Sequence, residues 1–294
     1  MLDAAHLRAE LRSSVAGWLG RASGALPVAI LVTIVGVLAS AALALSSLAD
    51  ERFDPALGRF GLWPLAAGTA ATTLVAIGLA APVALVAAVW VSELAPVAWR
   101  RPLASLFEGL GAIPAVVYGV WGRFSVVPFV RDHVEPALTS TPRGHGFGIA
   151  SAACVLAAMS LPLIASHAAA VLRGVPEPLR MTAFSLGATR WRVVSDVVLP
   201  AARSRLFGAV ALGVGRAVGE SIAVAMVIGG RTATPTGFFD ATSTLAAVLV
   251  DGYVDATHPE HVGALAVVAL VLAAIGGGAS AVARRFLSNA PRPA

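Results

Sequence analysis

The sequence predicts an all-α protein, a polytopic bundle of about six transmembrane helices. Of its 294 residues, 57% are hydrophobic and only 13% are charged, whereas a soluble domain carries about 25% charged residues. The mean hydropathy is +0.82. The apolar residues gather into long runs, and about 20 such residues are needed to cross a bilayer. A chain with so small a polar coat could not cover its surface in water, but it could in lipid.

Six apolar runs define the expected membrane domain, residues 24–286. We place the spans near 24–48, 65–91, 103–120, 149–171, 206–230 and 262–282. The first run is longer than the apolar part of a signal peptide, about 7–15 residues, although Ala42-Leu-Ala44 resembles a cleavage site. Residues 1–23 form a cytoplasmic tail or an interfacial helix, and residues 287–294 form a cytoplasmic tail.

Small and helix-breaking residues differ from run to run. The second run begins with glycine and threonines (Gly68, Thr69, Thr72 and Thr73), which permit close helix packing in lipid. The third contains Gly111 and Pro114, and the fourth contains Pro162. Such residues mark kinks, or broken helices that line a cavity, more often than span ends. Residues 123–130 either extend the third span or re-enter the membrane edge.

The arginines indicate the orientation, because cytoplasmic loops carry an excess of basic residues. With a cytoplasmic N-terminus, 14 arginines are inside and 6 are outside. The inside set is Arg8, Arg12, Arg21, Arg100, Arg101, Arg173, Arg180, Arg190, Arg192, Arg203, Arg205, Arg284, Arg285 and Arg292. The outside set is Arg52, Arg59, Arg123, Arg131, Arg143 and Arg231. Both termini and the 174–204 loop are therefore expected in the cytoplasm.

The sequence lacks the residues that several classes of function require. Lysine is absent, so no ATP-binding P-loop can be formed, and there is no HExxH, GxSxG or Cys/His metal cluster. We expect no catalytic residues, no metal and no cofactor in this chain. The basic residues lie in loops between spans, which argues for topology rather than for a nucleic-acid partner. Cys154 is expected as a buried thiol, and His133, His145, His258 and His261 as solvated side chains.

Two charges fall inside the fifth run. Arg216 and Glu220 are four residues apart, so on a continuous helix they share a face and can pair. Arginine at the centre of a span costs at least about 2.5–3.5 kcal/mol, and intramembrane charges usually face a pathway. A purely structural ion pair is the alternative. Glu108 in the third run is expected to pair near the interface with Arg100 or Arg101.

The external acidic residues between the fifth and sixth runs have two readings. Asp240, Asp251, Asp255 and Glu260 form either a docking surface for an external protein or ordinary solvated loop charge. They would repel an anion in transit.

The 174–204 loop carries a spaced motif. Ala183, Gly187, Val197, Leu199 and Pro200 fit a short helix, a glycine turn, a second helix and a proline stop. Gly187 can adopt a positive φ, and Thr189 can cap the following helix. This pattern resembles the cytoplasmic signature of ABC-transporter permeases, although Met181 and Thr182 stand where that family usually has glutamate and alanine.

Two further runs, residues 111–122 and 215–229, resemble permeases of phosphate-specific ABC transporters, of the C-type. The resemblance covers about Leu62 to Phe286. It implies an ABC importer permease fold with a cytoplasmic coupling helix in a bacterial inner membrane. Its implied partners are an A-type permease subunit, two ATPase subunits that bind ATP and Mg, and an external phosphate-binding protein, besides membrane lipid. Coupling to the ATPase is implied for Met181, Thr182, Ala183, Phe184, Gly187, Leu199 and Pro200.

The function expected from these residues is import of inorganic phosphate, with Arg216 and Glu220 in the substrate pathway. Guanidinium offers a planar fork for phosphate oxygens, and Glu220 would keep the site shallow enough to release its anion. One alternative is an ABC permease for sulfate or molybdate. Another is a stand-alone ion-coupled transporter or channel. A membrane enzyme lacks any cluster of catalytic residues.

Overall fold

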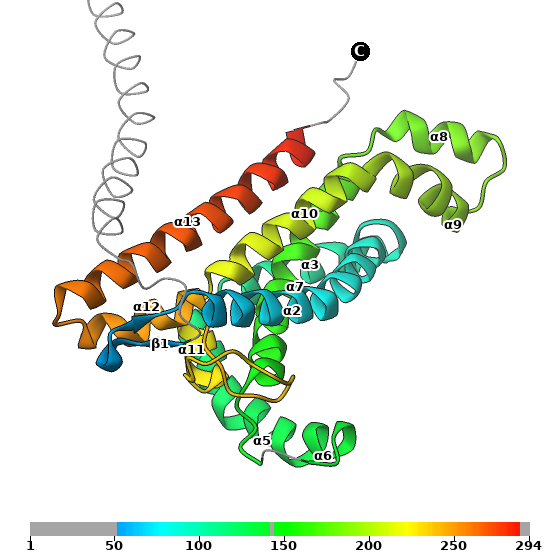
Figure 1. The fold of residues 1–294 in the computed structure, drawn as a ribbon. Coiled ribbons are helices and arrows are strands. Elements are labelled where there is room, and N and C mark those ends of the chain that lie inside the picture. The colour runs from blue at the N-terminus through cyan, green and yellow to red at the C-terminus, as the bar shows by residue number, and fades with distance from the viewer. Residues whose placement is uncertain (1–51, 142–143, 289–294) are drawn as a thin grey trace, which may run out of the picture.

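A computed structural model describes residues 52–141 and 144–288 of the chain, and they form a helical bundle with one small β-hairpin (Figure 1). The expected first span, near 24–48, the N-terminal tail and the last six residues lie outside the described residues. The all-α expectation is confirmed, apart from a two-stranded antiparallel ribbon formed by β1 (Phe53–Asp54) and β2 (Arg59–Phe60).

Within the described residues, four helical segments are long and apolar enough to cross a membrane, and a bent pair would make a fifth. The four are Trp63–Leu94, Ile149–Arg173, Arg190–Gly219 and Pro259–Leu287. The first consists of α2 (Trp63–Val89) and its π-helical end η2 (Trp90–Leu94), and the second is α7 (Ile149–Arg173). The third consists of α9 (Arg190–Arg192), the π-helical η5 (Val193–Val198) and α10 (Leu199–Gly219). The fourth lies within α13 (Pro259–Ser288).

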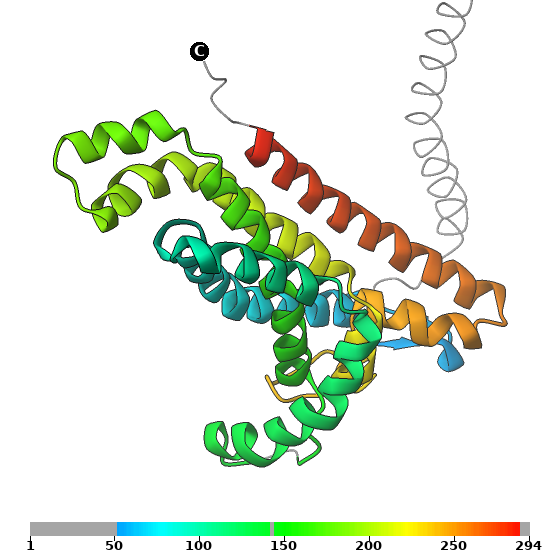
Figure 2. The ribbon, with the colours of Figure 1, turned by 180° about the vertical axis from the view of Figure 1, so that it is seen from behind.

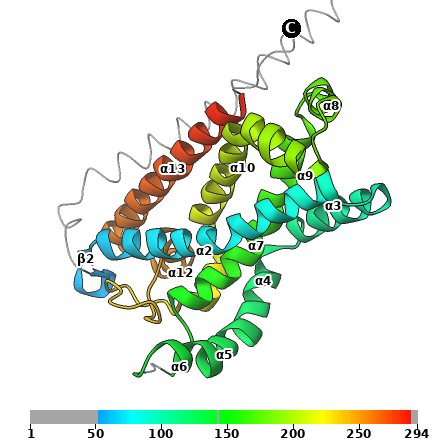
Figure 3. The ribbon, with the colours of Figure 1, turned by 90° about the vertical axis from the view of Figure 1, so that its right-hand side faces the viewer.

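These helices give the bundle two distinct ends. The end of α2, the end of α7, the start of α10 and the end of α13 lie toward the hairpin formed by α8 (Glu177–Ser185) and α9 (Figures 1 and 2). The β-hairpin and α12 (Leu245–Asp255) lie at the opposite end. In Figure 3 α10 and α13 run side by side, and α2 crosses α7. Most arginines expected inside are therefore at the α8–α9 end.

The start of α2 packs closely, as its small residues predict. A Cβ added at Gly68 would lie 2.1 Å from the carbonyl oxygen of Ser243, so only glycine permits this approach. The Thr69 hydroxyl donates to the Leu65 carbonyl at 2.7 Å and accepts from the Leu245 amide at 2.9 Å. The loop that leads into α12 is thereby fixed against α2.

The third apolar run departs from the single span expected over 103–120. It contains α3 (Val97–Gly111) and α4 (Ala115–Trp121), and the helices on either side of this break meet at 85°. Pro114 permits the break, because its ring has no N–H for a continuing helix. The second part runs on to Leu138 through π-helical η3 (Gly122–Val126), α5 (Val127–Phe129), π-helical η4 (Val130–Val134) and α6 (Glu135–Leu138). Residues 123–130 therefore continue the helix.

Proline alone does not predict where a helix stops. Pro82 lies inside α2 and Pro162 inside α7, and both helices continue past them. The proline stop expected at Pro200 is also wrong, since the helix is continuous from Arg190 to Gly219. The π-helical η5 ends immediately before Leu199, and such a widened turn accommodates a residue that lacks an N–H.

Much apolar surface faces outward. No residue of α3 is buried, and Trp99 and Leu106 are both exposed. Cys154 of α7 is exposed as well, which corrects the expectation of a buried thiol. In an apolar helix of this kind a side chain can face lipid or another subunit instead of the core of its own chain. Glu108 is exposed and forms no ion pair with Arg100 or Arg101 in the described part of the chain.

Candidate transport and coupling sites

The fifth apolar run is broken at its charged residues. Helix α10 ends at Gly219, and Glu220 adopts an extended backbone with φ −75° and ψ 115°. A second short helix, α11 (Ile222–Ile228), follows. The single span expected over 206–230 is therefore two helices. Because the i,i+4 relationship needs a continuous helix, Arg216 and Glu220 do not share a face, and they form no ion pair in the described structure.

Each of these charges is instead placed at a helix end. Arg216 lies in the last turn of α10 and is exposed, and a cation is favourable near the carbonyls at a helix C-terminus. The Glu220 carboxylate accepts a hydrogen bond of 3.4 Å from the Ala223 amide in the first turn of α11. The charges thus flank the break, and Arg216 has no carboxylate partner among the described residues.

The two broken runs meet. Gly119 of α4 approaches α11 so closely that an added Cβ would lie 2.5 Å from the Met226 sulfur and 3.1 Å from the Ala223 Cα. The Tyr118 hydroxyl donates to the Leu110 carbonyl at 3.1 Å, across the bend between α3 and α4. Tyr118 also lies within electrostatic range of Arg216. Interrupted helices that face each other are typical of substrate sites in membrane transporters.

The loop after α7 forms a helical hairpin, as its motif predicts. Helix α8 ends at a turn in which Gly187 has φ +83°, a conformation that favours glycine. The Thr189 hydroxyl caps the next helix by accepting from the Arg192 amide at 3.4 Å. Met181, Thr182, Phe184 and Gly187 are exposed, Ala183 is half-buried, and Leu199 and Pro200 lie further along, at the start of α10. The predicted coupling residues are therefore shared between a hairpin tip and a helix start.

An apolar surface covers this hairpin. Its members are large side chains that are 41–83% exposed, namely Leu179, Met181, Phe184, Leu186 and Trp191. Exposed apolar side chains gathered on one short hairpin are typical of a protein–protein contact.

A charged contact that the sequence does not predict fixes the base of the hairpin. Arg180 of α8 forms an ion pair with Glu93 in η2, and it also donates to the Leu172 carbonyl at 2.8 Å. The two side chains are only 12% and 8% exposed. Arg100 donates to the Ala95 and Glu93 carbonyls at 3.0 and 3.3 Å. The hairpin is therefore anchored to the end of α2 and to α7.

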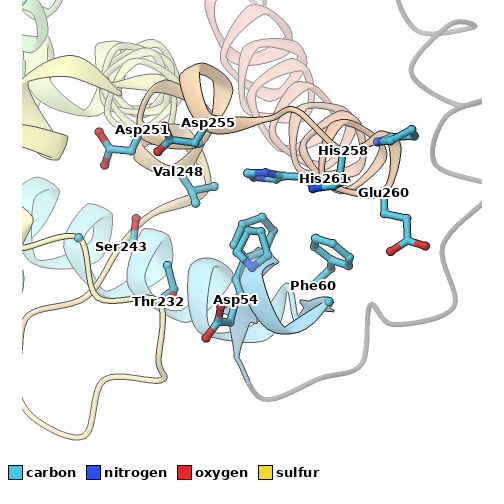
Figure 4. Close-up of a pocket in the computed structure, with 16 residues that line it drawn as sticks. Asp54, Phe60, Thr232, Ser243, Val248, Asp251, Asp255, His258, Glu260 and His261 are labelled. Carbon is cyan, nitrogen blue, oxygen red and sulfur yellow. The ribbon is translucent and has the colours of Figure 1, made fainter.

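A cavity of about 1010 Å³ lies at the opposite end, between the β-hairpin, α12 and the start of α13 (Figure 4). Four acidic residues line it, Asp54, Asp251, Asp255 and Glu260, and no arginine does among the described residues. Asp251 is exposed overall, but partial burial of its carboxyl raises the pKa above the ordinary value of an aspartate. The cavity therefore favours cationic groups.

His261 and Asp240 correct two expectations about this end. His261 is 8% exposed, and its ring packs with those of Phe53 and Phe60, so it is a core residue. Figure 4 shows the ring extending from α13 toward α12. Asp240 is 6% exposed and accepts from the Thr236 amide and hydroxyl at 2.9 and 2.6 Å. It shapes the loop and is no part of a solvated external surface.

Comparisons with known proteins agree with this architecture. The profile of the family described as "Binding-protein-dependent transport system inner membrane component" matches residues 65–288. The chain is 33% identical over 254 residues to the phosphate transport system permease protein PstC of Mesorhizobium japonicum, covering 82% of this chain and 78% of that protein. It is 34% identical to the PstC of Haemophilus influenzae, covering 72% and 71%.

A solved structure supports the fold independently. A chain of the MetNI methionine ABC transporter, in an inward-facing conformation, superposes with a TM-score of 0.55. It is 21% identical, and the match covers 74% of this chain and 93% of that chain. Since the family profile spans most of the chain and includes both the α8–α9 hairpin and the broken helices, the chain belongs to the family of inner-membrane components of binding-protein-dependent transport systems.

Proposed function

We propose that this chain is a permease subunit of an ATP-driven ABC importer that moves inorganic phosphate into a bacterial cell. The observation that carries the proposal is Arg216, a cation at the break between α10 and α11 that has no carboxylate partner among the described residues. Guanidinium matches the geometry of phosphate oxygens. A cation in an apolar segment is costly in lipid, so such residues usually face a water-filled cavity or a pathway. The names of the PstC relatives support phosphate as the anion.

Transport would be electrostatic and would need no covalent step. The anion would leave water at the outer end, meet Arg216 and lie beside Tyr118 at the bend of α3 and α4. Glu220 would weaken the attraction from the other side of the break, so that the anion is released. The outward-facing apolar surface of α3 would be covered by lipid or by an A-type permease subunit, which would complete the pathway.

The hairpin of α8 and α9 would receive the energy of ATP hydrolysis. Its exposed apolar residues and the Gly187 turn would dock on one of two cytoplasmic ATPase subunits, which would bind the ATP and Mg. In this arrangement the hairpin and both termini would lie in the cytoplasm. The acidic cavity would then lie outside, where Asp251 and Asp255 would contact basic groups of an external phosphate-binding protein.

Reconstitution tests this proposal. The chain would be assembled in proteoliposomes with candidate A-type permease, ATPase and binding-protein subunits, and ATP hydrolysis would be measured with phosphate, sulfate or molybdate. We expect phosphate alone to stimulate hydrolysis and to accumulate inside. Stimulation by sulfate or molybdate would assign another oxyanion. Anion movement without ATP or ATPase subunits would favour a stand-alone transporter or channel instead.

A further inference from the structure

A second cavity, of about 300 Å³, lies at the base of the coupling hairpin, and its lining includes neither Arg216 nor Glu220. Its volume is at the lower end of the range for small-molecule sites, about 300–1,000 Å³. Four arginines line it, Arg100, Arg173, Arg180 and Arg190, against two glutamates, Glu93 and Glu177. They come from α3, α7, α8, α9 and η2, so any ligand here would touch every element that anchors the hairpin.

The positive charge in this cavity is only partly neutralised. Arg180 is paired with Glu93 and lies 3.6 Å from Glu177. Arg173 and Arg190 have neither an ion pair nor a side-chain hydrogen bond in the described part of the chain. Unpaired guanidinium groups around one cavity form a site for an oxyanion, which they can bind through bidentate, charge-assisted hydrogen bonds.

Glu93 restricts which oxyanion fits. Its side chain is 8% exposed, one carboxylate oxygen is held by Arg180, and the other, Oε1, is buried with no donor in the described structure. A buried acceptor without a donor is costly. Inorganic phosphate keeps an O–H group at neutral pH and can supply that donor. A phosphate monoester loses its last proton near pH 6, and sulfate and phosphodiesters have none.

We propose that this cavity binds inorganic phosphate and that bound phosphate slows the transporter. The anion would bridge Arg190 and Arg173 beside Glu93, and so join α9 of the hairpin to α7 and η2. A hairpin fixed in this way could not follow the ATPase subunits. Binding at the cavity does not depend on which anion is transported. Only the interpretation as feedback by the imported product rests on the proposed function.

Direct binding is the first test, and it uses the complex without its binding protein. Arg216→Ala serves as the background, to remove the pathway site, and equilibrium binding of radiolabelled phosphate is measured at constant ionic strength. Adding Arg190→Gln should weaken binding at least about tenfold, since it removes a charge-assisted contact. Adding Arg192→Gln, an exposed arginine of α9 outside the cavity, should leave binding unchanged. Equal effects of the two substitutions would overturn the proposal, and so would equal competition by sulfate.

Activity is the second test. ATP and phosphate are added only to the solution outside the proteoliposomes. Only complexes whose ATPase subunits face that solution can hydrolyse the ATP, and their rate is measured as ADP release. Phosphate should slow wild type and Arg192→Gln equally, whereas Arg190→Gln should need about tenfold more phosphate. Any inhibition of the ATPase subunits by their own product phosphate is the same in wild type, Arg192→Gln and Arg190→Gln. Absence of this difference would overturn the feedback role, even where uptake itself is intact.

A third arm separates free phosphate from lipid. Nanodiscs of phosphatidylcholine with 0 or 10 mol% phosphatidic acid are compared without added phosphate. We expect equal ADP release in both. A slower rate with phosphatidic acid that Arg190→Gln relieves would assign the cavity to a lipid headgroup and overturn our proposal. Because the binding test needs no uptake, its result stands even where phosphate proves not to be the transported anion.

Discussion

Arg216 lies in the last turn of α10, whereas Glu220 lies beyond that helix and accepts a hydrogen bond from the first turn of α11. The two charges are four residues apart but belong to different helix ends. Each can therefore be changed without leaving the other as half of a broken ion pair. This separates the effect of a charge on transport from its effect on stability.

Arg216→Ala should abolish phosphate uptake while the complex still assembles. The guanidinium is exposed and has no carboxylate partner in the described structure, so its removal leaves no buried charge unpaired. Uptake of radiolabelled phosphate and co-purification of the partner subunits measure the two effects. Arg203→Ala, an exposed arginine near the other end of α10, is the matched control. Normal uptake by a well-assembled Arg216→Ala complex would contradict the pathway role.

Gly187→Ala should weaken coupling at little cost in assembly. The residue has φ +83°, and nothing lies within 4 Å of an added Cβ, so the penalty is backbone strain of about 1–2 kcal/mol. That strain would reshape the hairpin tip. Phosphate transported per ATP hydrolysed should fall. Gly187→Asn should be milder, because asparagine adopts this conformation more readily; equal losses in both would argue against strain as the cause.

Glu93→Gln should destabilise the chain far more than Glu177→Gln. Both glutamates lie near Arg180, but Glu93 is 8% exposed and Glu177 is 72% exposed. Breaking a buried ion pair costs ~3–5 kcal/mol, whereas an exposed pair contributes ~0–1 kcal/mol. Thermal unfolding of the two variants in the same detergent provides the comparison. Similar melting temperatures would show that Glu93 does not anchor the hairpin.

Asp251→Asn should raise stability near neutral pH and leave it unchanged in acid. Burial raises the pKa of Asp251 in the folded chain. The folded state therefore binds more protons between the unfolded and folded pKa values, and stability falls as pH rises through that window. Asparagine removes this penalty. Melting temperatures at about pH 3, below the ordinary pKa of an aspartate, and near pH 7 check the sign. A variant that is less stable than wild type near pH 7 would refute it.

The sequence predicts the helical hairpin well, because its geometry is local. A glycine at a helix end and a threonine before the next helix determine the turn within a few residues, and Gly187 and Thr189 adopt the expected roles. The long apolar helices are also predictable from local sequence, because their length and composition alone show that they are compatible with a bilayer.

Tertiary contacts decide the features that the sequence does not predict. Glu93 and Arg180 are 87 positions apart, and no spacing rule relates them. His261 is buried because β1 and β2 place Phe53 and Phe60 beside it. No proline marks the break at Glu220 in the sequence, whereas the helices that contain Pro82 and Pro162 continue past them. Whether a helix is interrupted depends on which neighbours receive its free backbone groups.

The unbroken helix from Arg190 to Gly219 has a mechanical consequence. It begins three residues after the Gly187 turn and carries Arg216 near its far end, about 40 Å away at 1.5 Å per residue. Such a helix cannot shorten appreciably, so a displacement that a docked ATPase subunit applied at the hairpin end would also move the Arg216 guanidinium. The two sites would then be linked by one rigid helix and not by a series of small side-chain shifts.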